Sequence, residues 1–393
     1  MGSMAKYRKI KRHKIKYTRH RKKNSVLKTV LFIILLGVLV FLAYSVAGPI
    51  KKLFTGELTT SDTSSVSSVT SDSPSSDIVS DTSSAVVPSE TETLKAITMP
   101  TDTILDAAKQ DAFLSEAKAK GYQAVLVELK DDSGMIYFRS SVSAINGDKA
   151  IAENAVSAET LAKKLQDAGM VPVAAVHTFK DKTAPDKTKD NTFMVKNSTY
   201  TWFDRAASDG GKPWLNPYKE SARNYNLTIV EDLAKAGFKE IILKSVHFPE
   251  INSMNKAQLD TSVSISEILN QYVASAQAAA AKYHAKIAVS YNAVGYWTEK
   301  KVTYGGEAGS IKADAIAPVI RIADYGNKLT FGETVIESPQ QNINAAVKAV
   351  IAQIQAKTAG QKPDIIPIIA SGQNTDEIVK ALAEAGINSY VVE

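Results

Sequence analysis

Cysteine is absent from all 393 residues, which excludes disulfides and thiolate metal sites. The chain also lacks a glycine-rich phosphate loop and the motifs H-E-x-x-H and G-x-S-x-G. Nucleotide-binding, zinc-protease and serine-hydrolase functions therefore have no support from the sequence, and we expect no cofactor and no metal. If the chain is exported, the absence of disulfides fits a bacterial cell surface.

Charged side chains are missing from residues 29–50 (TVLFIILLGVLVFLAYSVAGPI). Roughly 20 apolar residues in a helix cross about 30 Å of hydrocarbon, so this run predicts a single transmembrane anchor. Twelve Lys or Arg residues precede the run, and two follow it directly. Because basic residues are retained on the cytoplasmic side, we predict a cytoplasmic tail at residues 1–28 and an extracellular C-terminal domain at the cell membrane. A cleaved signal peptide is the alternative, since Ser45-Val46-Ala47 approximates a cleavage site.

Large apolar residues become scarce in residues 51–93, and from residue 59 to residue 93 the chain is almost entirely Ser, Thr, Asp, Val and Pro. So little apolar surface cannot offset the entropy of ordering, and we predict a disordered linker. Without the 14 basic residues up to Lys52, the chain carries 33 Lys and Arg against 41 Asp and Glu, a difference of −8. This balance does not suggest a nucleic-acid partner, so membrane topology and anionic lipid explain the N-terminal basic cluster.

Eight short apolar runs alternate with helical patterns across residues 94–393. Strands are predicted at residues 94–99, 124–129, 171–176, 240–244, 286–290, 315–319, 365–369 and 389–392. Helices are predicted at residues 102–120, 158–168, 217–236, 264–283, 339–357 and 375–385. Ser338 is the expected N-cap of the fifth helix, and Gly121, Gly237 and Gly386 are expected to end three others. The alternation predicts an α/β domain, a (β/α)₈ TIM barrel, with a doubly wound open sheet as the alternative.

Polar side chains gather at the predicted C-terminal ends of these strands, where the active sites of such barrels lie. They are Glu128, Lys130, Asp131, Asp132, His177, Lys244, His247, Glu250, Tyr291, Asn292, Arg321, Asp324, Ser371 and Gln373. Carboxylates, histidines and amides at one mouth suit carbohydrate recognition or hydrolysis, in which two acids flank a glycosidic bond. The alternative is that any barrel has polar strand ends, and that residues 131–134 form a turn before a short strand at 135–138.

Five segments carry a resemblance to a known family. They are residues 127–134 (VELKDDSG), 174–181 (AAVHTFKD), 214–218 (WLNPY), 224–226 (NYN) and 246–249 (VHFP). In this order the segments resemble the glycosyl hydrolase domain family of bacterial surface proteins, TIM barrels distantly similar to the α-amylase-like glycosidases. The resemblance covers residues 94–393 and implies that acids at the barrel mouth act on a glycan. The candidate catalytic acids are Glu128, Asp131, Asp132 and Glu250.

Departures from the family pattern affect the expected activity. Lys244 stands where the family has an acid at the fourth strand, His247 replaces its arginine, and Asn216 replaces its aspartate. A cation there would repel the positive charge of an oxocarbenium-like transition state. We therefore predict a catalytically impaired barrel that binds an envelope polysaccharide or an envelope protein, with an active glycoside hydrolase as the alternative. Lys244 is expected to pair with Glu128, or with the two aspartates just beyond it.

Aromatic residues in the predicted loops suit stacking on sugar rings. Trp214, Tyr218, Tyr291, Tyr296 and Trp297 lie outside periodic core positions, and packing beneath loops is the alternative role. The complete set of candidate binding residues is Lys130, His177, Trp214, Asn216, Tyr218, Lys244, His247, Tyr291, Asn292, Trp297 and Arg321.

Overall fold

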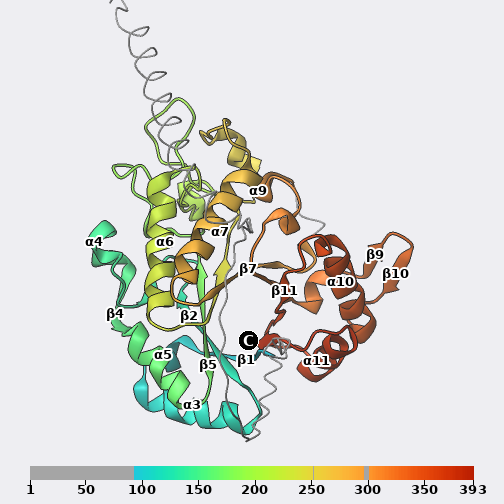
Figure 1. Cartoon of the computed structure of the whole chain (residues 1–393). Helices are drawn as coiled ribbons and strands as arrows, with labels where there is room; N and C mark the ends of the chain where they lie inside the picture. Colours follow the sequence, from blue (N-terminus) through green and yellow to red (C-terminus); the bar gives the residue numbers. More distant parts are fainter. Residues whose placement is uncertain (1–92, 251, 296–300) are drawn as a thin grey trace, which may run out of the picture. The chain divides into compact units, whose positions relative to one another are not determined.

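The computed structural model describes residues 93–250, 252–295 and 301–393, which belong to one compact unit (Figure 1). The predicted cytoplasmic tail, anchor and linker lie outside these residues, apart from the last linker position. Among the residues described, no helix has the length and apolar character needed to cross a bilayer. Those three predictions therefore stay predictions.

Eight parallel strand positions, each called a stave because β11 and β12 share one of them, close into a barrel within the described residues. In ring order they are β1 (Lys95–Met99), β2 (Ala124–Lys130), β5 (Val171–His177), β6 (Glu240–Lys244), β7 (Lys286–Asn292), β8 (Ala315–Ile320), β11 with β12 (Asp364–Ile365 and Ile368–Ile369) and β13 (Tyr390–Val392). The seventh stave is interrupted at Pro367, which has no N–H to donate to the ladder. Because β1 pairs with both β2 and β13, the ring is closed and the open-sheet alternative is wrong.

Helices connect most of the staves and cover them from outside. The main ones are α3 (Ala107–Ala119), α5 (Ala158–Asp167), α6 (Glu220–Lys235), α7 (Ile265–Ala281), α10 (Ile343–Thr358) and α11 (Thr375–Glu384). Short helices are α2 (Thr101–Ile104), α4 (Ser143–Asn146) and α9 (Lys301–Tyr304). The predicted first helix is split, because Asp106 caps α3 by accepting a hydrogen bond from the N–H of Ala108. The glycines at positions 121, 237 and 386 have left-handed φ, as predicted for helix ends.

The predicted start of the fifth helix at Ser338 is wrong. A hairpin of β9 (Lys328–Phe331) and β10 (Thr334–Glu337) runs up to this residue, and Ser338 itself has φ 47°. Its N–H donates to the carbonyl of Asn327, which extends the hairpin by one residue. Helix α10 therefore begins at Ile343, and the serine and proline belong to the turn before it.

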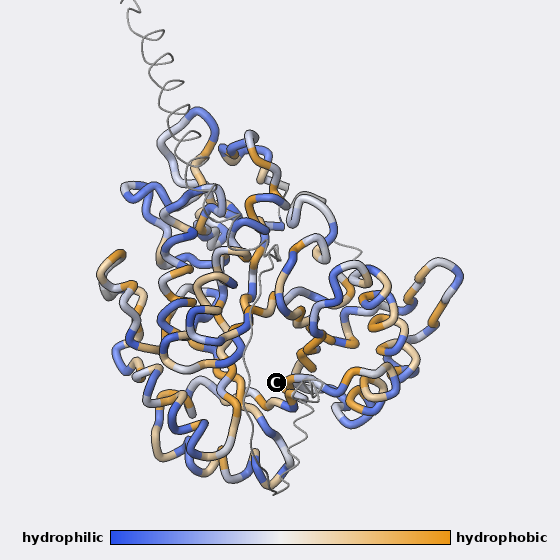
Figure 2. Tube along the Cα trace, viewed as in Figure 1, coloured by the Kyte–Doolittle hydropathy of each residue, from blue (hydrophilic) through white to orange (hydrophobic). Residues whose placement is uncertain are grey.

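Apolar residues occupy two layers because strand side chains alternate between the faces of a sheet. The barrel interior holds mostly small residues, including Ala96, Ala124, Ala175, Ala288 and Ala317. The outward positions, such as Val125, Val127, Leu129, Ile241 and Leu243, pack beneath the helices. In Figure 2 apolar positions follow the strands and the helices beside them, whereas many outer loops are hydrophilic. A one-residue register shift would exchange the two layers, so this alternation fixes which side chains reach the barrel mouth.

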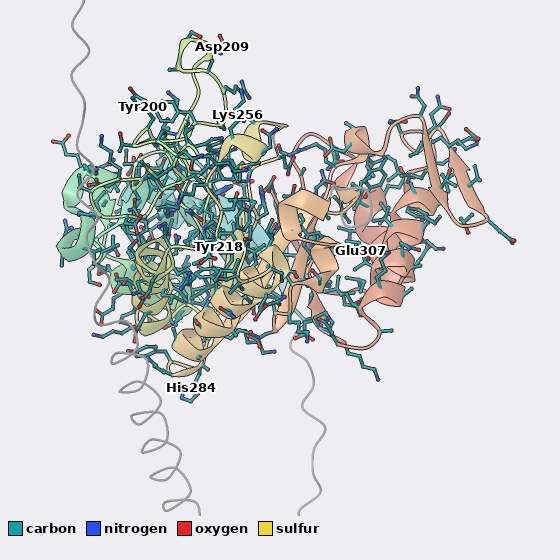
Figure 3. All side chains as sticks on the ribbon, turned by 90° about the horizontal axis from the view of Figure 1, so that it is seen from above. Tyr200, Asp209, Tyr218, Lys256, His284 and Glu307 are labelled. Atoms are coloured by element: carbon teal, nitrogen blue, oxygen red, sulfur yellow. The ribbon has the colours of Figure 1, made fainter. Side chains whose placement is uncertain are left out.

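Two long insertions follow strands at the C-terminal side of the barrel. The first contains β3 (Ile136–Phe138) and β4 (Ile151–Val156), and β3 pairs antiparallel with the end of β2, which confirms the short strand predicted at 135–138. The second, residues 178–219, links β5 to α6 and carries Tyr200 and Asp209 at its outer edge (Figure 3). Both insertions contact each other through the turn that follows β2.

Candidate functional site

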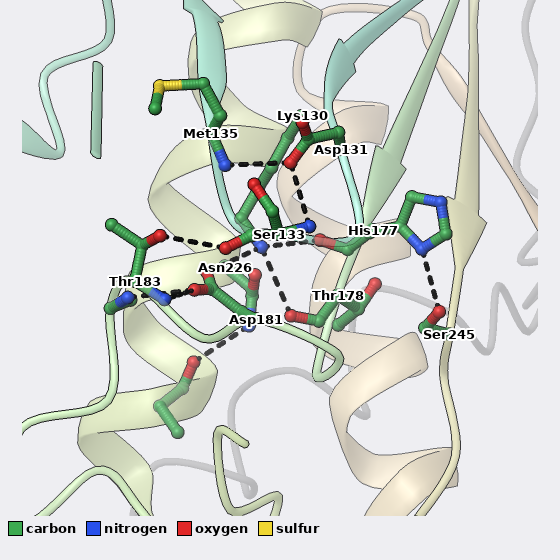
Figure 4. Close-up of polar contacts among 12 residues, drawn as sticks. Lys130, Asp131, Ser133, Met135, His177, Thr178, Asp181, Thr183, Asn226 and Ser245 are labelled. Atoms are coloured by element: carbon green, nitrogen blue, oxygen red, sulfur yellow. Dashed lines mark hydrogen bonds and ion pairs between the residues drawn. The ribbon is translucent and has the colours of Figure 1, made fainter. Parts of the chain in front are cut away.

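Lys130 connects the two insertions from a fully buried position. Its Nζ lies 2.9 Å from Oδ2 of Asp181, and neither side chain is exposed to solvent. The same ammonium donates hydrogen bonds to the carbonyls of His177 at 2.6 Å and Thr178 at 3.3 Å (Figure 4). A buried ammonium needs such partners because an unpaired one is costly. Lys130 therefore holds two loops together and does not face a ligand, contrary to its predicted binding role.

Gly134 fits against the same aspartate. Its φ is +87°, and a Cβ at this position would lie 2.0 Å from Oδ1 of Asp181. That oxygen also accepts hydrogen bonds from the N–H groups of Thr183 and Ala184. The segments KDDSG and HTFKD therefore interlock, and part of the motif that carries the family resemblance has a structural purpose.

Asp131 organises the turn between β2 and β3. Oδ1 accepts hydrogen bonds from the N–H groups of Ser133 and Met135, and Oδ2 accepts one from the Tyr137 hydroxyl at 2.7 Å. Burial alone would raise the pKa of Asp131, but the hydrogen bonds from Tyr137 and Ser133 outweigh it and the pKa is lowered. An ionised carboxylate with its oxygens occupied in this way is poorly suited to donate a proton to a substrate.

Asp132 points toward the surface and pairs with Lys180. The Nζ to Oδ2 distance is 2.6 Å, and the aspartate side chain is 53% exposed. The hydrogen bond from Lys180 lowers the pKa of Asp132. Two of the four candidate acids are therefore used in a turn and a surface ion pair.

The barrel mouth contains a cleft of about 370 Å³. Its lining includes seven of the predicted residues: His177, Lys244, His247, Glu250, Tyr291, Asn292 and Arg321. It also includes Ser245, Ser290, Tyr304, Val319 and Glu393, which the sequence reading missed. Side chains from β5, β6, β7, β8 and β13 thus meet at the carboxyl ends of the strands, as the fold requires.

Lys244 is the central charge of this mouth. Its Nζ lies 2.6 Å from Oε2 of Glu128 and 3.7 Å from Oε1 of Glu393. Ile242, two residues earlier in β6, belongs to the barrel interior, so Lys244 also points inward. The predicted contact with Glu128 is confirmed, and the alternative in which Lys244 faces outward is wrong. Glu393 is an additional partner that follows directly after β13.

His177 lies beside this ion pair. Its Nδ1 is 2.8 Å from the hydroxyl of Ser245, and its Nε2 is 4.0 Å from Oε2 of Glu128. Burial, followed by the positive charges of Lys244 and Lys130, lowers the pKa of His177 to about 3. The imidazole is therefore neutral at neutral pH, so its approach to Glu128 is not an ion pair.

His247 packs between two aromatic rings. Its ring centroid lies 5.8 Å from that of Trp214 and 5.5 Å from that of Tyr304. Nδ1 is 2.8 Å from the carbonyl of Phe248, so this nitrogen carries the proton and donates it. Burial lowers the pKa of His247, which leaves a second neutral imidazole at the cleft.

Three predicted binding residues serve the loop above α6 and are not part of the cleft lining. Trp214 is buried and donates from Nε1 to Asp204, and Asn216 is buried and accepts from the N–H of Tyr218. The hydroxyl of Tyr218 donates to the carbonyl of Val263 at 3.0 Å. Among the aromatics predicted to stack on sugars, Tyr291 lines the cleft, whereas residues 296 and 297, including the predicted Trp297, lie outside the described residues.

The far side of the cleft is polar. Oδ2 of Asp324 accepts a hydrogen bond from Asn292 at 2.8 Å and lies 3.7 Å from Arg321, whose side chain is 52% exposed. Glu250 is exposed at the rim of the cleft, and Gln373 accepts a hydrogen bond from the N–H of Ile322. Within the described residues, no group of three or more His, Asp or Glu side chains is arranged to hold a metal ion.

A comparison with protein families decides the classification of this barrel. Residues 96–392 match the family described as "Putative glycosyl hydrolase domain". The chain belongs to this family. The resemblance drawn from the sequence segments is therefore confirmed. Among curated proteins, none is significantly similar to the chain.

Solved structures that resemble this chain include glycoside hydrolases. The PgaB (BpsB) glycoside hydrolase domain from Bordetella bronchiseptica is 14% identical, with 77% of this chain and 94% of that chain covered and a TM-score of 0.50. A hypothetical protein from Ruminiclostridium thermocellum is 21% identical over 46% of this chain and 91% of that chain, with a TM-score of 0.41. The likeness to the PgaB (BpsB) domain supports the barrel fold and is not evidence about function.

Proposed function

We propose that this glycosyl hydrolase-like barrel binds a glycan of the cell envelope without hydrolysing it. The observation that carries the proposal is the contact of 2.6 Å between Lys244 and Glu128 at the floor of the mouth. A glycosidase needs one carboxyl group to protonate the leaving oxygen and a second to stabilise or attack the sugar carbon. Lys244 removes the second acid from the fourth strand and holds the nearest remaining carboxylate in an ion pair.

The charge of Lys244 also opposes the reaction itself. The transition state of glycoside hydrolysis develops positive charge at the sugar carbon, and a fixed ammonium nearby raises its energy. The neutral imidazoles of His177 and His247 supply hydrogen-bonding groups without a compensating negative charge. These features favour recognition of a neutral, hydroxyl-rich ligand over stabilisation of an oxocarbenium-like centre.

Aromatic and polar groups around the ion pair suit a sugar ligand. Tyr291 and Tyr304 contribute ring surface to the cleft, while Asn292, Ser290 and Arg321 contribute hydrogen-bonding groups. Sugar rings bury C–H groups on aromatic faces and exchange hydrogen bonds with such polar side chains. The volume of about 370 Å³ suits one or two sugar units rather than an entire polysaccharide chain.

The positions of the two carboxylates also support a second candidate function, that of an active glycoside hydrolase. Glu128 and Glu393 each contact the Nζ of Lys244, so their nearest oxygens are at most about 6.3 Å apart. Carboxyl groups of retaining glycosidases are about 5–5.5 Å apart, which is compatible with this limit. Hydrolysis would then require Lys244 to release both acids when substrate binds.

Location is the remaining part of the proposal. The apolar run at 29–50 and the basic residues before it support a single-pass anchor with the barrel on the extracellular side. An envelope polysaccharide is the ligand that a barrel in this place meets, and an envelope protein is the other partner that we consider. The Ser- and Thr-rich residues 51–93 would give the barrel reach along the cell surface.

Binding of the detergent-solubilised full chain to a glycan array and to isolated cell-wall polysaccharide tests the proposal. We expect binding that is lost in Arg321→Ala, which removes an exposed side chain of the cleft, and kept in Tyr200→Ala. Tyr200 is 76% exposed on the insertion and is not part of the cleft, so it serves as the control. Equal loss in both variants, or capture of an envelope protein in place of a glycan, would contradict glycan binding at the mouth.

A further inference from the structure

Lys244 reaches the middle of the barrel mouth and meets a residue from the opposite side. In the ring order β1, β2, β5, β6, β7, β8, β11 with β12, and β13, the staves β6 and β13 are four positions apart in either direction. They are therefore opposite each other, and the approach of Lys244 to Glu393 at 3.7 Å spans the opening. The ammonium consequently lies close to the barrel axis, in the position where barrels of this type bind the reacting part of a ligand.

Two carboxylates surround this ammonium from separate staves. Glu128 approaches from β2 at 2.6 Å and Glu393 from the end of β13 at 3.7 Å. The lysine side chain is 16% exposed, whereas the two glutamates are 27% and 28% exposed. Two negative charges thus face one positive charge in a partly buried place, where charges interact more strongly than they do in water.

Among the residues that the structure describes, neighbouring groups give the second negative charge no other close cation. His177 is neutral because burial, Lys244 and Lys130 lower its pKa to about 3. Arg321 lines the cleft but lies 3.7 Å from Asp324, and Lys180 is engaged by Asp132. Within the described residues, Lys244 is the cation in ion-pair contact with Glu128 and with Glu393.

We propose that Glu128 and Glu393 form a binding site for a primary ammonium group, and that the side chain of Lys244 is its built-in occupant. In the unmodified chain the site is filled, so cationic ligands are excluded from the centre of the mouth. When the lysine is shortened, the site takes an external alkylammonium ion of matching length. Glu393 is then a residue of the site in its own right, although nothing in the family motifs marks it.

The proposal rests on the positions of three side chains and is independent of glycan binding. Its failure would leave the glycan proposal standing, and failure on a glycan array would leave the ammonium site standing. The readout is the thermal stability of the full chain, which changes when a charged cavity is emptied or refilled.

Lys244→Ala with n-propylammonium chloride is the direct test, because alanine keeps Cβ and propylammonium supplies the remaining three carbons and the ammonium. We expect the variant to melt about 4–8 °C below the unmodified chain, since one partner of a part-buried charge cluster has been removed. Propylammonium at saturating concentration should restore at least half of that shift. Sodium chloride at the same ionic strength should restore little.

Two controls make the result specific. Lys357→Ala removes a lysine that, in the described residues, pairs with one carboxylate, that of Glu307, at 2.7 Å, and we expect no selective rescue by propylammonium. Lys244→Ala combined with Glu393→Gln should lose most of the rescue, because one wall of the site has lost its charge. Equal stabilisation by sodium chloride, rescue that survives Glu393→Gln, or no rescue of a folded Lys244→Ala variant would each overturn the proposal.

A double-mutant cycle covers the case in which Lys244→Ala does not fold. Lys244→Met fills the space with an apolar side chain of similar length, and Glu393→Gln removes one carboxylate charge. The two losses of stability in urea should be clearly non-additive if the ammonium and Glu393 form one site. Additive losses would mean that Glu393 does not take part, and the two-carboxylate site would be refuted.

Discussion

The ammonium of Lys130 lies 2.9 Å from a carboxylate oxygen of Asp181, and both side chains are fully buried. This contact joins the turn after β2 to the long insertion after β5, and both segments frame the mouth. Removing one partner leaves the other charge buried without compensation, which is far more costly than replacing the pair with apolar groups. Because Lys130 also bonds to the carbonyl of His177, the pair lies next to one residue of the cleft lining.

The first prediction follows from this contact. Lys130→Met should destabilise the protein by about 3–5 kcal/mol in urea denaturation followed by tryptophan fluorescence, because Asp181 loses its counter-charge. A second change, Asp181→Asn, made in that variant should recover part of the loss. A Lys130→Met chain as stable as the parent would show that the buried pair does not hold the loops.

Gly134 supplies the second prediction. Gly134→Ala should cost clearly more stability than Gly121→Ala, although both residues have left-handed φ, +87° and +80°. The new methyl group at 134 would meet Asp181 at 2.0 Å, whereas nothing lies within 4 Å of a Cβ at 121. The helix-end variant therefore measures the backbone cost alone, on the order of 1 kcal/mol, and any excess measures the clash. Equal melting temperatures for the two variants would contradict the interlock.

The third prediction concerns pH and the opposite end of the barrel. Glu240 is 7% exposed at the start of β6, and burial raises its pKa to about 8 despite attraction from Lys286, with Asp314 and Asp364 adding to the rise. Because the unfolded chain releases this proton near pH 4.5, stability should fall as pH rises from there toward 8. Glu240→Gln should remove that part of the fall, on the order of 1–4 kcal/mol between pH 5 and pH 9.

Urea denaturation of Glu240→Gln and of the surface control Glu159→Gln at several pH values measures this effect. The difference in unfolding free energy between Glu240→Gln and the parent should grow with pH up to about 8 and level off above it. A difference that stays constant from pH 5 to pH 9 would mean that Glu240 titrates in the folded chain as it does in the unfolded one.

The fourth prediction tests the reason for the proposed loss of catalysis. The unmodified chain should show no appreciable turnover of cell-wall polysaccharides or chromogenic glycosides. Lys244→Asp restores an acid at the fourth strand and frees Glu128, so we expect turnover at least about tenfold above the parent. Robust turnover by the unmodified chain that Glu128→Gln abolishes would instead establish the active hydrolase.

The fifth prediction concerns location and uses intact cells. A protease added outside should release a soluble fragment of about 300 residues by cutting in residues 51–93, since disordered segments are cut before folded ones. Protection of the barrel until the cells are lysed would place it on the other side of the membrane.

Most of the barrel could be predicted from the sequence because its strands are short, apolar and separated by helices that end at glycine. The meeting of Lys244 with Glu128 was predictable for the same reason, since parallel strands bring their carboxyl ends to one mouth. The turn at Ser338 was not, because serine before proline occurs both at helix starts and in turns. The role of Lys130 was misjudged because the pairing of β2 with β5 shifts register between Glu128 and Lys130, whereas simple alternation would place both side chains on one face. Asp131 was misjudged because its carboxylate is used by the turn that the sequence offered as the alternative. Glu393 was predictable as a residue of the mouth, because it directly follows the last predicted strand.

Ring closure has a consequence for how the protein is made. One of the two partners of β1 is β13, and the N–H of Leu94 bonds to the hydroxyl of Ser389, 295 residues away. A chain that is synthesised, or carried across a membrane, from the β1 end of the barrel toward the β13 end cannot seal the barrel until its last strand has emerged. Glu393 arrives with that strand, so the partner of Lys244 across the mouth is delivered in the same final step of folding.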